Sequence, residues 1–186
     1  MTLLTMQFGY SFTQLTHINM EQETIQEEFF FFWETKSPFS QWHPVGFEIN
    51  GIHYKTAEHY MMWGKAMLFN DEETAAEILE VKHPRDVKAL GRKVKNFDSN
   101  LWTEQCQNIV YQGNYAKFTQ NPEMRKALRD TDRMELVEAA PNDKIWGIGM
   151  TADDPRAQNR ETWDGQNLLG IVLTSLREKL RFEGNL

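Results

Sequence analysis

The hydrophobic pattern of this chain changes its period close to residue 55. Before that point, apolar side chains alternate over residues 47–54 around Asn50-Gly51, a dipeptide that suits a type I′ hairpin turn because both central positions need positive φ. After it, residues 57–68 are good helix formers with a broad apolar face, and Thr56 stands where a helix N-cap belongs. The pattern therefore predicts a hairpin that runs directly into a helix.

Helical signals dominate the rest of the chain. Further helices are expected to begin near Asn70 with Glu73 completing a capping box, at Pro84, at Asp98 or Ser99, at Asn121-Pro122 and at Asn167. Short strands are expected at residues 29–33, 134–138 and 144–146, with a long polar loop over residues 147–165. The predicted fold is mostly α with a small β-sheet (α+β). It forms one domain over residues 27–182, preceded by an N-terminal extension, residues 1–26, that we expect to be poorly ordered or loosely docked.

Composition limits the class of protein. The chain has 186 residues and is 40% hydrophobic, which is enough for one domain with its own core. Its single cysteine, Cys106, cannot form an intrachain disulfide, which fits a reducing cytoplasm. No apolar run approaches the roughly 20 residues of a membrane span, and no signal peptide is recognisable at the N-terminus. We therefore expect a cytoplasmic protein without a membrane segment.

Charge argues against one class of partner. The formal net charge is −7 and no basic run is present, whereas proteins that coat nucleic acid usually show a basic face. An enzyme that acts on one extruded base stays compatible with this charge. The histidines share no zinc-ligand spacing and no cysteine pair exists, so neither a metal site nor a cofactor is expected.

Glu58, Met62 and Lys65 follow the spacing i, i+4, i+7 and should share one face of the helix over residues 57–68. Seven residues separate the acid from the amine by about 10 Å along the axis, so a small ligand could lie between them. In the simpler alternative, Glu58 complements the helix dipole and Lys65 extends to water. Spacing alone leaves both interpretations open.

A second candidate region lies near residue 143. Asp143 precedes an expected strand, and Gly147 and Gly149 follow it, where they could admit a ligand close to the backbone. Trp42, Trp102 and Trp146 could stack on a flat base, although most tryptophans belong to cores.

Five motifs occur in an order that resembles the NADAR superfamily of YbiA-like N-glycosidases: PFSQWHP, TAEHYMMWGKA, LGRKV, NDKIWGIG and NLLGIVLTSLRE. The resemblance extends from about residue 29 to residue 180. It implies a mostly helical fold with a small sheet, and cleavage of the N-glycosidic bond between ribose and a base or amine. Two substrate classes are implied: ribosylamino-pyrimidine phosphates of riboflavin synthesis, and ADP-ribose attached to guanine in nucleic acid.

The resemblance also implies site residues. Glu58, Lys65 and Asp143 take the catalytic positions. The implied substrate-binding positions are Gln41, Trp42, Arg92, Trp102, Trp146, Gly147 and Asn167. This chain departs from the family in having Gln41 where an asparagine is frequent, and in a longer acid-containing loop over residues 151–165.

These positions suggest roles. N-glycosidic cleavage passes through an oxocarbenium-like state, so Glu58 and Asp143 would stabilise positive charge or position water, in an order that the sequence leaves open. Lys65 would either bind an oxygen as a cation or attack an opened ribose C1 as a Schiff-base nucleophile. Trp102 would stack on the base, and Arg92 would hold phosphate. The alternatives are a non-catalytic module that binds ADP-ribose or a related nucleotide, and a helical interaction protein without a pocket.

Overall fold

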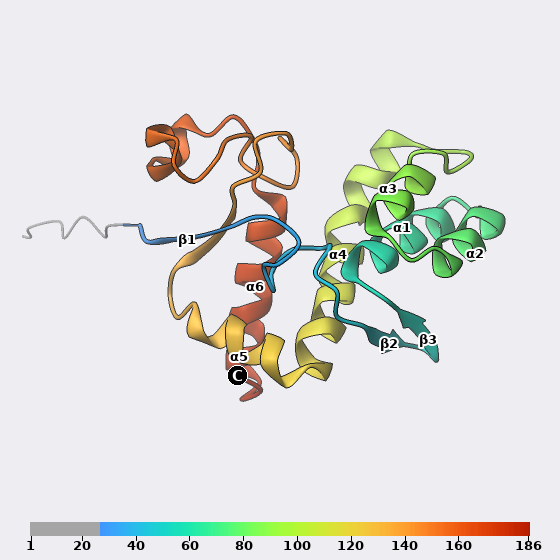
Figure 1. The fold of residues 1–186 in the computed structure, drawn as a ribbon, viewed down its shortest axis with the longest axis horizontal. Coiled ribbons are helices and arrows are strands. Elements are labelled where there is room, and N and C mark those ends of the chain that lie inside the picture. The colour runs from blue at the N-terminus through green and yellow to red at the C-terminus, as the bar shows by residue number, and fades with distance from the viewer. Residues whose placement is uncertain (1–26) are drawn as a thin grey trace, which may run out of the picture.

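The computed structural model describes residues 27–186, so the expectation for residues 1–26 lies outside the described residues. The described part contains six α-helices, four short strands and two short 3-10 helices, and the prediction of a mostly α fold with little sheet is confirmed. Helix α4 (Ser99–Gln120) runs through the middle of the molecule and packs against α1 (Ala57–Leu68) and α6 (Leu168–Phe182). Figure 1 shows α4 between α1 on one side and α6 on the other.

The strands form two separate two-stranded sheets. β2 (Phe47–Ile49) and β3 (Ile52–Tyr54) make the predicted hairpin, and Asn50 and Gly51 both have positive φ, 53° and 78°. β1 (Phe29–Phe32) pairs in parallel with β4 (Glu135–Glu138), and Phe32 lies opposite Glu138. This pair brings together segments that lie about a hundred residues apart in the sequence.

The predicted strand over residues 144–146 is wrong. These residues form a bend instead, because the Asp143 carboxylate accepts hydrogen bonds from the backbone N–H groups of Ile145 and Trp146. The long loop over residues 147–165 contains two short 3-10 helices, η1 (Pro155–Gln158) and η2 (Arg160–Thr162). It is also less polar in its packing than expected, because it buries Ile148, Met150 and Ala157 against Val137.

The three helices between residues 57 and 91 each begin at a residue that favours a helix start. Thr56 caps α1, with its side chain accepting a hydrogen bond from the His59 N–H. Helix α2 (Glu72–Glu80) is capped by Asp71, so the predicted capping box at Asn70 is wrong. Asn70 instead adopts a left-handed φ of 56° in the turn that ends α1. Helix α3 (Pro84–Gly91) begins at the predicted proline.

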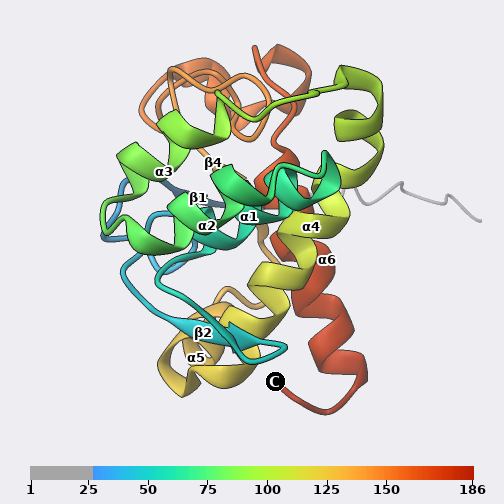
Figure 2. The same cartoon turned by 90° about the vertical axis from the view of Figure 1, so that its right-hand side faces the viewer.

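Helices α1, α2 and α3 pack against one another, and Figure 2 shows them gathered beside α4. Gly91 permits the close approach of α3 to α1, since a Cβ at this position would lie 2.0 Å from the Met62 sulfur. Helix α5 (Pro122–Asp130) follows α4 after Asn121, as predicted. Cys106 is buried within α4.

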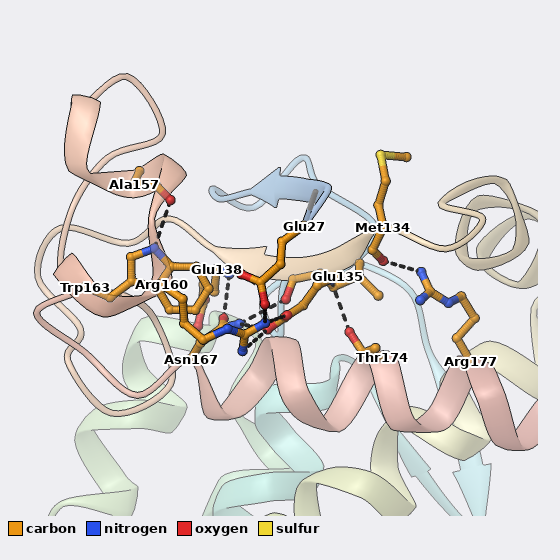
Figure 3. A network of polar contacts seen from close by, with 11 residues as sticks. Glu27, Met134, Glu135, Glu138, Ala157, Arg160, Trp163, Asn167, Thr174 and Arg177 are labelled. Atoms are coloured by element: carbon orange, nitrogen blue, oxygen red, sulfur yellow. Dashed lines mark hydrogen bonds and ion pairs between the residues drawn. The ribbon is translucent and has the colours of Figure 1, made fainter. Parts of the chain in front are cut away.

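Strand β4 is attached to α6 by side chains. Asn167, the residue before α6, has a φ of 54°. Its amide nitrogen donates to the Leu136 carbonyl at 3.0 Å, and its oxygen accepts from the Glu138 N–H at 2.9 Å. The Thr174 hydroxyl accepts a further bond from the Leu136 N–H. Figure 3 shows Asn167 and Thr174 reaching from α6 to the strand. The end of β4 is therefore fixed from a part of the chain thirty residues away.

Candidate active site

A cavity of about 260 Å³ lies between α1, α3 and the segment over residues 138–146. Of the residues predicted from the sequence, Gln41, Trp42, Glu58, Lys65, Arg92, Trp102, Asp143 and Trp146 line it. Glu58 and Lys65 lie on one face of α1, as their spacing predicts, while Asp143 comes from the opposite wall. The alternative of a helical interaction protein without a pocket is wrong, because these three side chains meet in one cavity.

Glu58 is a buried carboxyl group on the first turn of α1, with 5% of its surface exposed. Removal from water raises its pKa to about 7. Three groups lower this pKa: the positive charge of Lys88, a hydrogen bond from the Trp42 side chain, and the positive charge of Arg92. The negative charge of Asp143 raises it further. Glu58 can therefore gain or lose a proton near neutral pH, which is the property needed in a general acid or base.

Lys65 occupies the other end of the α1 face. Its Nζ donates a hydrogen bond to the Gly91 carbonyl at 2.8 Å and lies 4.3 Å from the ring centroid of Phe97 and 5.5 Å from that of Trp102. Partial burial lowers the pKa of this amine. The aromatic faces stabilise its cationic form, and the lowered pKa makes its neutral form more accessible.

Two side chains of α4 hold the loop that carries Gln41. The Lys117 amine donates to the Ser40 carbonyl at 2.9 Å, and the Asn114 amide donates to the Gln41 side-chain oxygen at 2.8 Å. The Gln41 amide nitrogen is buried and finds no hydrogen-bond partner within residues 27–186. Gln41 also lines the cavity, so a buried donor without a partner in the described residues lies at the cavity wall.

Asp143 lines the cavity and also holds the backbone of the residues that follow it. One carboxylate oxygen accepts the N–H groups of Ile145 and Trp146, at 3.0 and 2.9 Å, and so shapes the turn that presents Trp146. The other oxygen lies 3.9 Å from the Lys88 amine. Asp143 therefore presents negative charge to the cavity from a fixed position.

Sequence reasoning missed Glu138. This residue ends β4, lines the cavity, and has a side-chain oxygen, Oε2, that is buried with no hydrogen-bond partner in the described part of the chain. Burial raises its pKa to about 8, with Asp143 adding to the increase and Lys88 opposing it. A usable signal existed, because an acid at the carboxyl end of a predicted strand stands where ligands of open sheets commonly bind.

Lys88 was also missed. It lies on α3, one turn before the Gly91-Arg92 pair, and lines the cavity with its amine 3.9 Å from the Asp143 carboxylate. Its charge lowers the pKa of both Glu58 and Glu138.

Two predicted substrate-binding residues lie outside the cavity lining. The Gly147 carbonyl accepts a hydrogen bond from the Asn167 N–H at 3.1 Å, and the Asn167 side chain is committed to β4. Both residues support the backbone that carries Glu138. Their contact with a substrate stays a prediction.

Two absences apply to residues 27–186 only. Over this range, no group of three or more His, Cys, Asp or Glu side chains is placed to hold a metal ion. Within the same range, no helix has the length and apolarity to cross a membrane.

The site thus combines three carboxyl groups with Lys65, Lys88 and Arg92 around one small cavity. Mutual repulsion and burial favour protonation of Glu58 and Glu138, while the basic groups favour ionisation. Such a site can hold a proton on one carboxyl and negative charge on another at the same pH, which suits a reaction that needs an acid and a base together.

Comparison with known proteins identifies relatives over most of the chain. The N-glycosidase R617 of Acanthamoeba polyphaga mimivirus is 44% identical over 146 residues, which cover 76% of this chain and 86% of the relative. Protein irg-1 of Caenorhabditis elegans is 36% identical, covering 82% and 79%. The N-glycosidase YbiA of Escherichia coli is 30% identical, covering 87% and 94%.

Fold comparison agrees with the sequence comparison. The NMR structure of the E. coli protein YbiA superposes with a TM-score of 0.70 at 30% identity, covering 89% of this chain and 92% of that one. The NADAR domain matches residues 29–181, which include every helix and strand of the described fold except the last residue of α6. The chain therefore belongs to the NADAR domain family.

Proposed function

We propose that this protein hydrolyses the N-glycosidic bond that joins a ribosyl phosphate or ADP-ribosyl group to a base or amine. The general activity is carried by relatives named N-glycosidase, so the chain is a hydrolase acting on N-glycosyl bonds. The observation that carries the finer proposal is the convergence of Glu58, Lys65 and Asp143 on one cavity. Ribosylamino-pyrimidine phosphates and ADP-ribosyl-guanine in nucleic acid are the substrate classes that we propose, in a cytoplasmic setting.

The phosphate-bearing part of the substrate belongs at the cationic end of the cavity. Lys65 and Arg92 line this end, and Trp102 borders it. This position beside Lys65 assigns Trp102 to the ribosyl phosphate instead of the stacking on the base expected from the sequence. A guanidinium group binds phosphate oxygens through two parallel hydrogen bonds, and the ammonium group adds a point charge. The Gln41 amide nitrogen, which has no partner in the described residues, would donate to a ribose hydroxyl once the amide turns into the cavity.

The carboxyl groups would carry the bond cleavage. As the C1–N bond breaks, negative charge on Asp143 stabilises the oxocarbenium-like ribose. Glu58 as a carboxylate takes a proton from the attacking water, whose oxygen bonds to C1. Glu138 in its protonated form gives a proton to the departing nitrogen, a role that its raised pKa supports. One proton is taken from water and one is delivered to the leaving group.

The lowered pKa of Lys65 favours a second mechanism for an opened ribose. In it, the ribose ring opens to an imine between C1 and the base nitrogen, and the neutral amine of Lys65 adds to C1. The base leaves with a proton as its free amine, which leaves a Schiff base between Lys65 and C1, and one water then hydrolyses this Schiff base to release the sugar. Trapping with borohydride during turnover, followed by mass spectrometry, distinguishes the two mechanisms. A reduced adduct on Lys65 supports the Schiff base, and turnover without any adduct supports the cation role.

The decisive experiment presents the purified protein with the two proposed substrates. Incubation with ADP-ribosylated guanine DNA and with a ribosylamino-pyrimidine phosphate should release free ADP-ribose or ribose phosphate from at least one. Glu58→Gln protein serves as the inactive control. Tight binding of ADP-ribose without any released product from either substrate would contradict the proposal and support the non-catalytic module.

A further inference from the structure

A second cavity of about 390 Å³ adjoins the first. The residues that line both are Ser40, Trp42, Lys88, Glu138 and Asp143. The two cavities are therefore the two ends of one cleft, and the carboxyl groups of Glu138 and Asp143 stand at their junction. Glu58, Lys65 and Arg92 line the first cavity only.

The two ends differ in chemistry. Among residues 27–186, the second cavity has no cation in its lining besides the shared Lys88. It has instead Trp33, which is 45% exposed, together with the polar side chains of Glu34 and Asn142. This end therefore suits a flat, hydrogen-bonding ring better than a phosphate.

Trp33 lies where the chain leaves β1, and it lines the second cavity together with Glu138. β1 and β4 run parallel with Phe32 opposite Glu138, and Trp33 is the next residue after Phe32. Phe32 is buried, but the chain places the larger tryptophan in contact with solvent. An exposed indole therefore shares this cavity with the residue that would protonate the leaving nitrogen.

We propose that the second cavity is the leaving-group subsite and that Trp33 stacks on a flat heteroaromatic base. The inference rests on the proposed function, because it places the scissile bond at Glu138 and Asp143. With the phosphate-bearing ribose at Lys65 and Arg92, the departing base extends into the second cavity. Its polar edge meets Glu34 and Asn142, which together offer hydrogen-bond acceptors and donors.

The first test measures binding without turnover, using the tryptophan indole N–H signals in NMR spectra. Guanosine should shift the signal of Trp33, which is assigned from its loss in Trp33→Phe protein. Ribose 5-phosphate should shift the indole N–H signal of Trp102 and leave the Trp33 signal unchanged. Trp163, whose indole donates to the Ala157 carbonyl away from the cleft, is the internal reference. A Trp33 signal that does not respond to guanosine would overturn the inference.

The second test measures kinetics with whichever proposed substrate the wild-type protein cleaves. Trp33→Ala should raise KM about tenfold, as expected for loss of one stacked base, while Trp33→Phe keeps a ring and should stay within about threefold. Phe182→Ala removes an exposed ring far along α6 and should leave KM unchanged. Equal KM values for Trp33→Ala and wild type would refute the subsite.

The two tests separate the inference from the function on which it rests. If the wild-type protein cleaves neither substrate but guanosine still shifts Trp33, the hydrolase mechanism fails and the base subsite stands. If turnover occurs and neither test involves Trp33, the mechanism stands and the subsite is rejected.

Discussion

The two walls of the cleft are built by different means. The helical wall, formed by α1 and α3, presents Glu58, Lys65 and Arg92 from regular helices or their ends. The loop wall, residues 138–146, presents Glu138, Asp143 and Trp146 from a strand end and a turn. Helix geometry orders the first wall, whereas single hydrogen bonds from side chains order the second.

The walls also divide the charge. The amines and the guanidinium group lie on the helical wall, and two of the three carboxyl groups lie on the loop wall. A substrate between them would therefore meet cations on its phosphate side and proton-transferring groups on its leaving-group side. We therefore expect the rate of bond cleavage to depend on the three carboxyl groups of the cavity. We expect the positions of the loop-wall side chains to depend on Asn167 and on the pairing of β1 with β4.

The largest expected effect comes from the one acid on the helical wall. Glu58→Gln should lower kcat/KM by roughly 10²–10⁴-fold, because the amide cannot take a proton from water. The fold should persist, since the replacement has the same shape, and circular dichroism checks this. Glu72→Gln, an exposed acid in the first turn of α2, is the matched control. Normal turnover by Glu58→Gln protein would remove this acid from the mechanism.

The acid on the loop wall should have a smaller effect with a distinct pH signature. The pKa values of Glu58 and Glu138, about 7 and about 8, predict a bell-shaped kcat/KM profile. Activity rises with pH as Glu58 ionises and falls as Glu138 loses its proton. Glu138→Gln should lower the rate on the order of 10²-fold and abolish the fall at high pH. Glu135→Gln on the same strand is the control, and an unchanged basic limb in Glu138→Gln protein would exclude Glu138 as the acid.

Much of the helical wall could be predicted from the sequence because its causes are local. The spacing of Glu58 and Lys65 fixes their common face, and Thr56 caps the helix that carries them. The loop wall has non-local causes. The sequence of residues 144–146 predicts a strand. In the structure the Asp143 carboxylate accepts the Ile145 and Trp146 N–H groups, which a strand would donate to its neighbour. The importance of Glu138 emerges only when β1 pairs with β4 and Asn167 binds its backbone.

A third experiment tests this non-local support. Asn167→Ala leaves the Glu138 N–H and the Leu136 carbonyl without their partner, which should reduce the free energy of unfolding by about 2–4 kcal/mol. Asn167→Gly relieves the left-handed backbone but removes the same amide, so it separates the two contributions. Denaturant unfolding measures both variants. Wild-type stability in Asn167→Gly protein would show that the amide contacts contribute little.

The smallest expected effect concerns stability against pH. Burial raises the pKa of Glu58 and Glu138 above that of an unfolded glutamate, so these groups favour the folded state when protonated. Their contribution is complete below about pH 4 and is lost as pH rises through their folded pKa values. Each glutamine variant should therefore gain about 2–4 °C in Tm relative to wild type at pH 9 compared with pH 5. An identical Tm difference at both pH values would contradict burial of these carboxyl groups.

The parallel pairing of β1 with β4 has a practical consequence for anyone who shortens this protein. A version starting at Pro38 would still carry all five sequence motifs and would pass a search for the family pattern. It would nevertheless leave β4 without the only strand that pairs with it among residues 27–186. Motif content is thus a poor guide to where this enzyme can be cut.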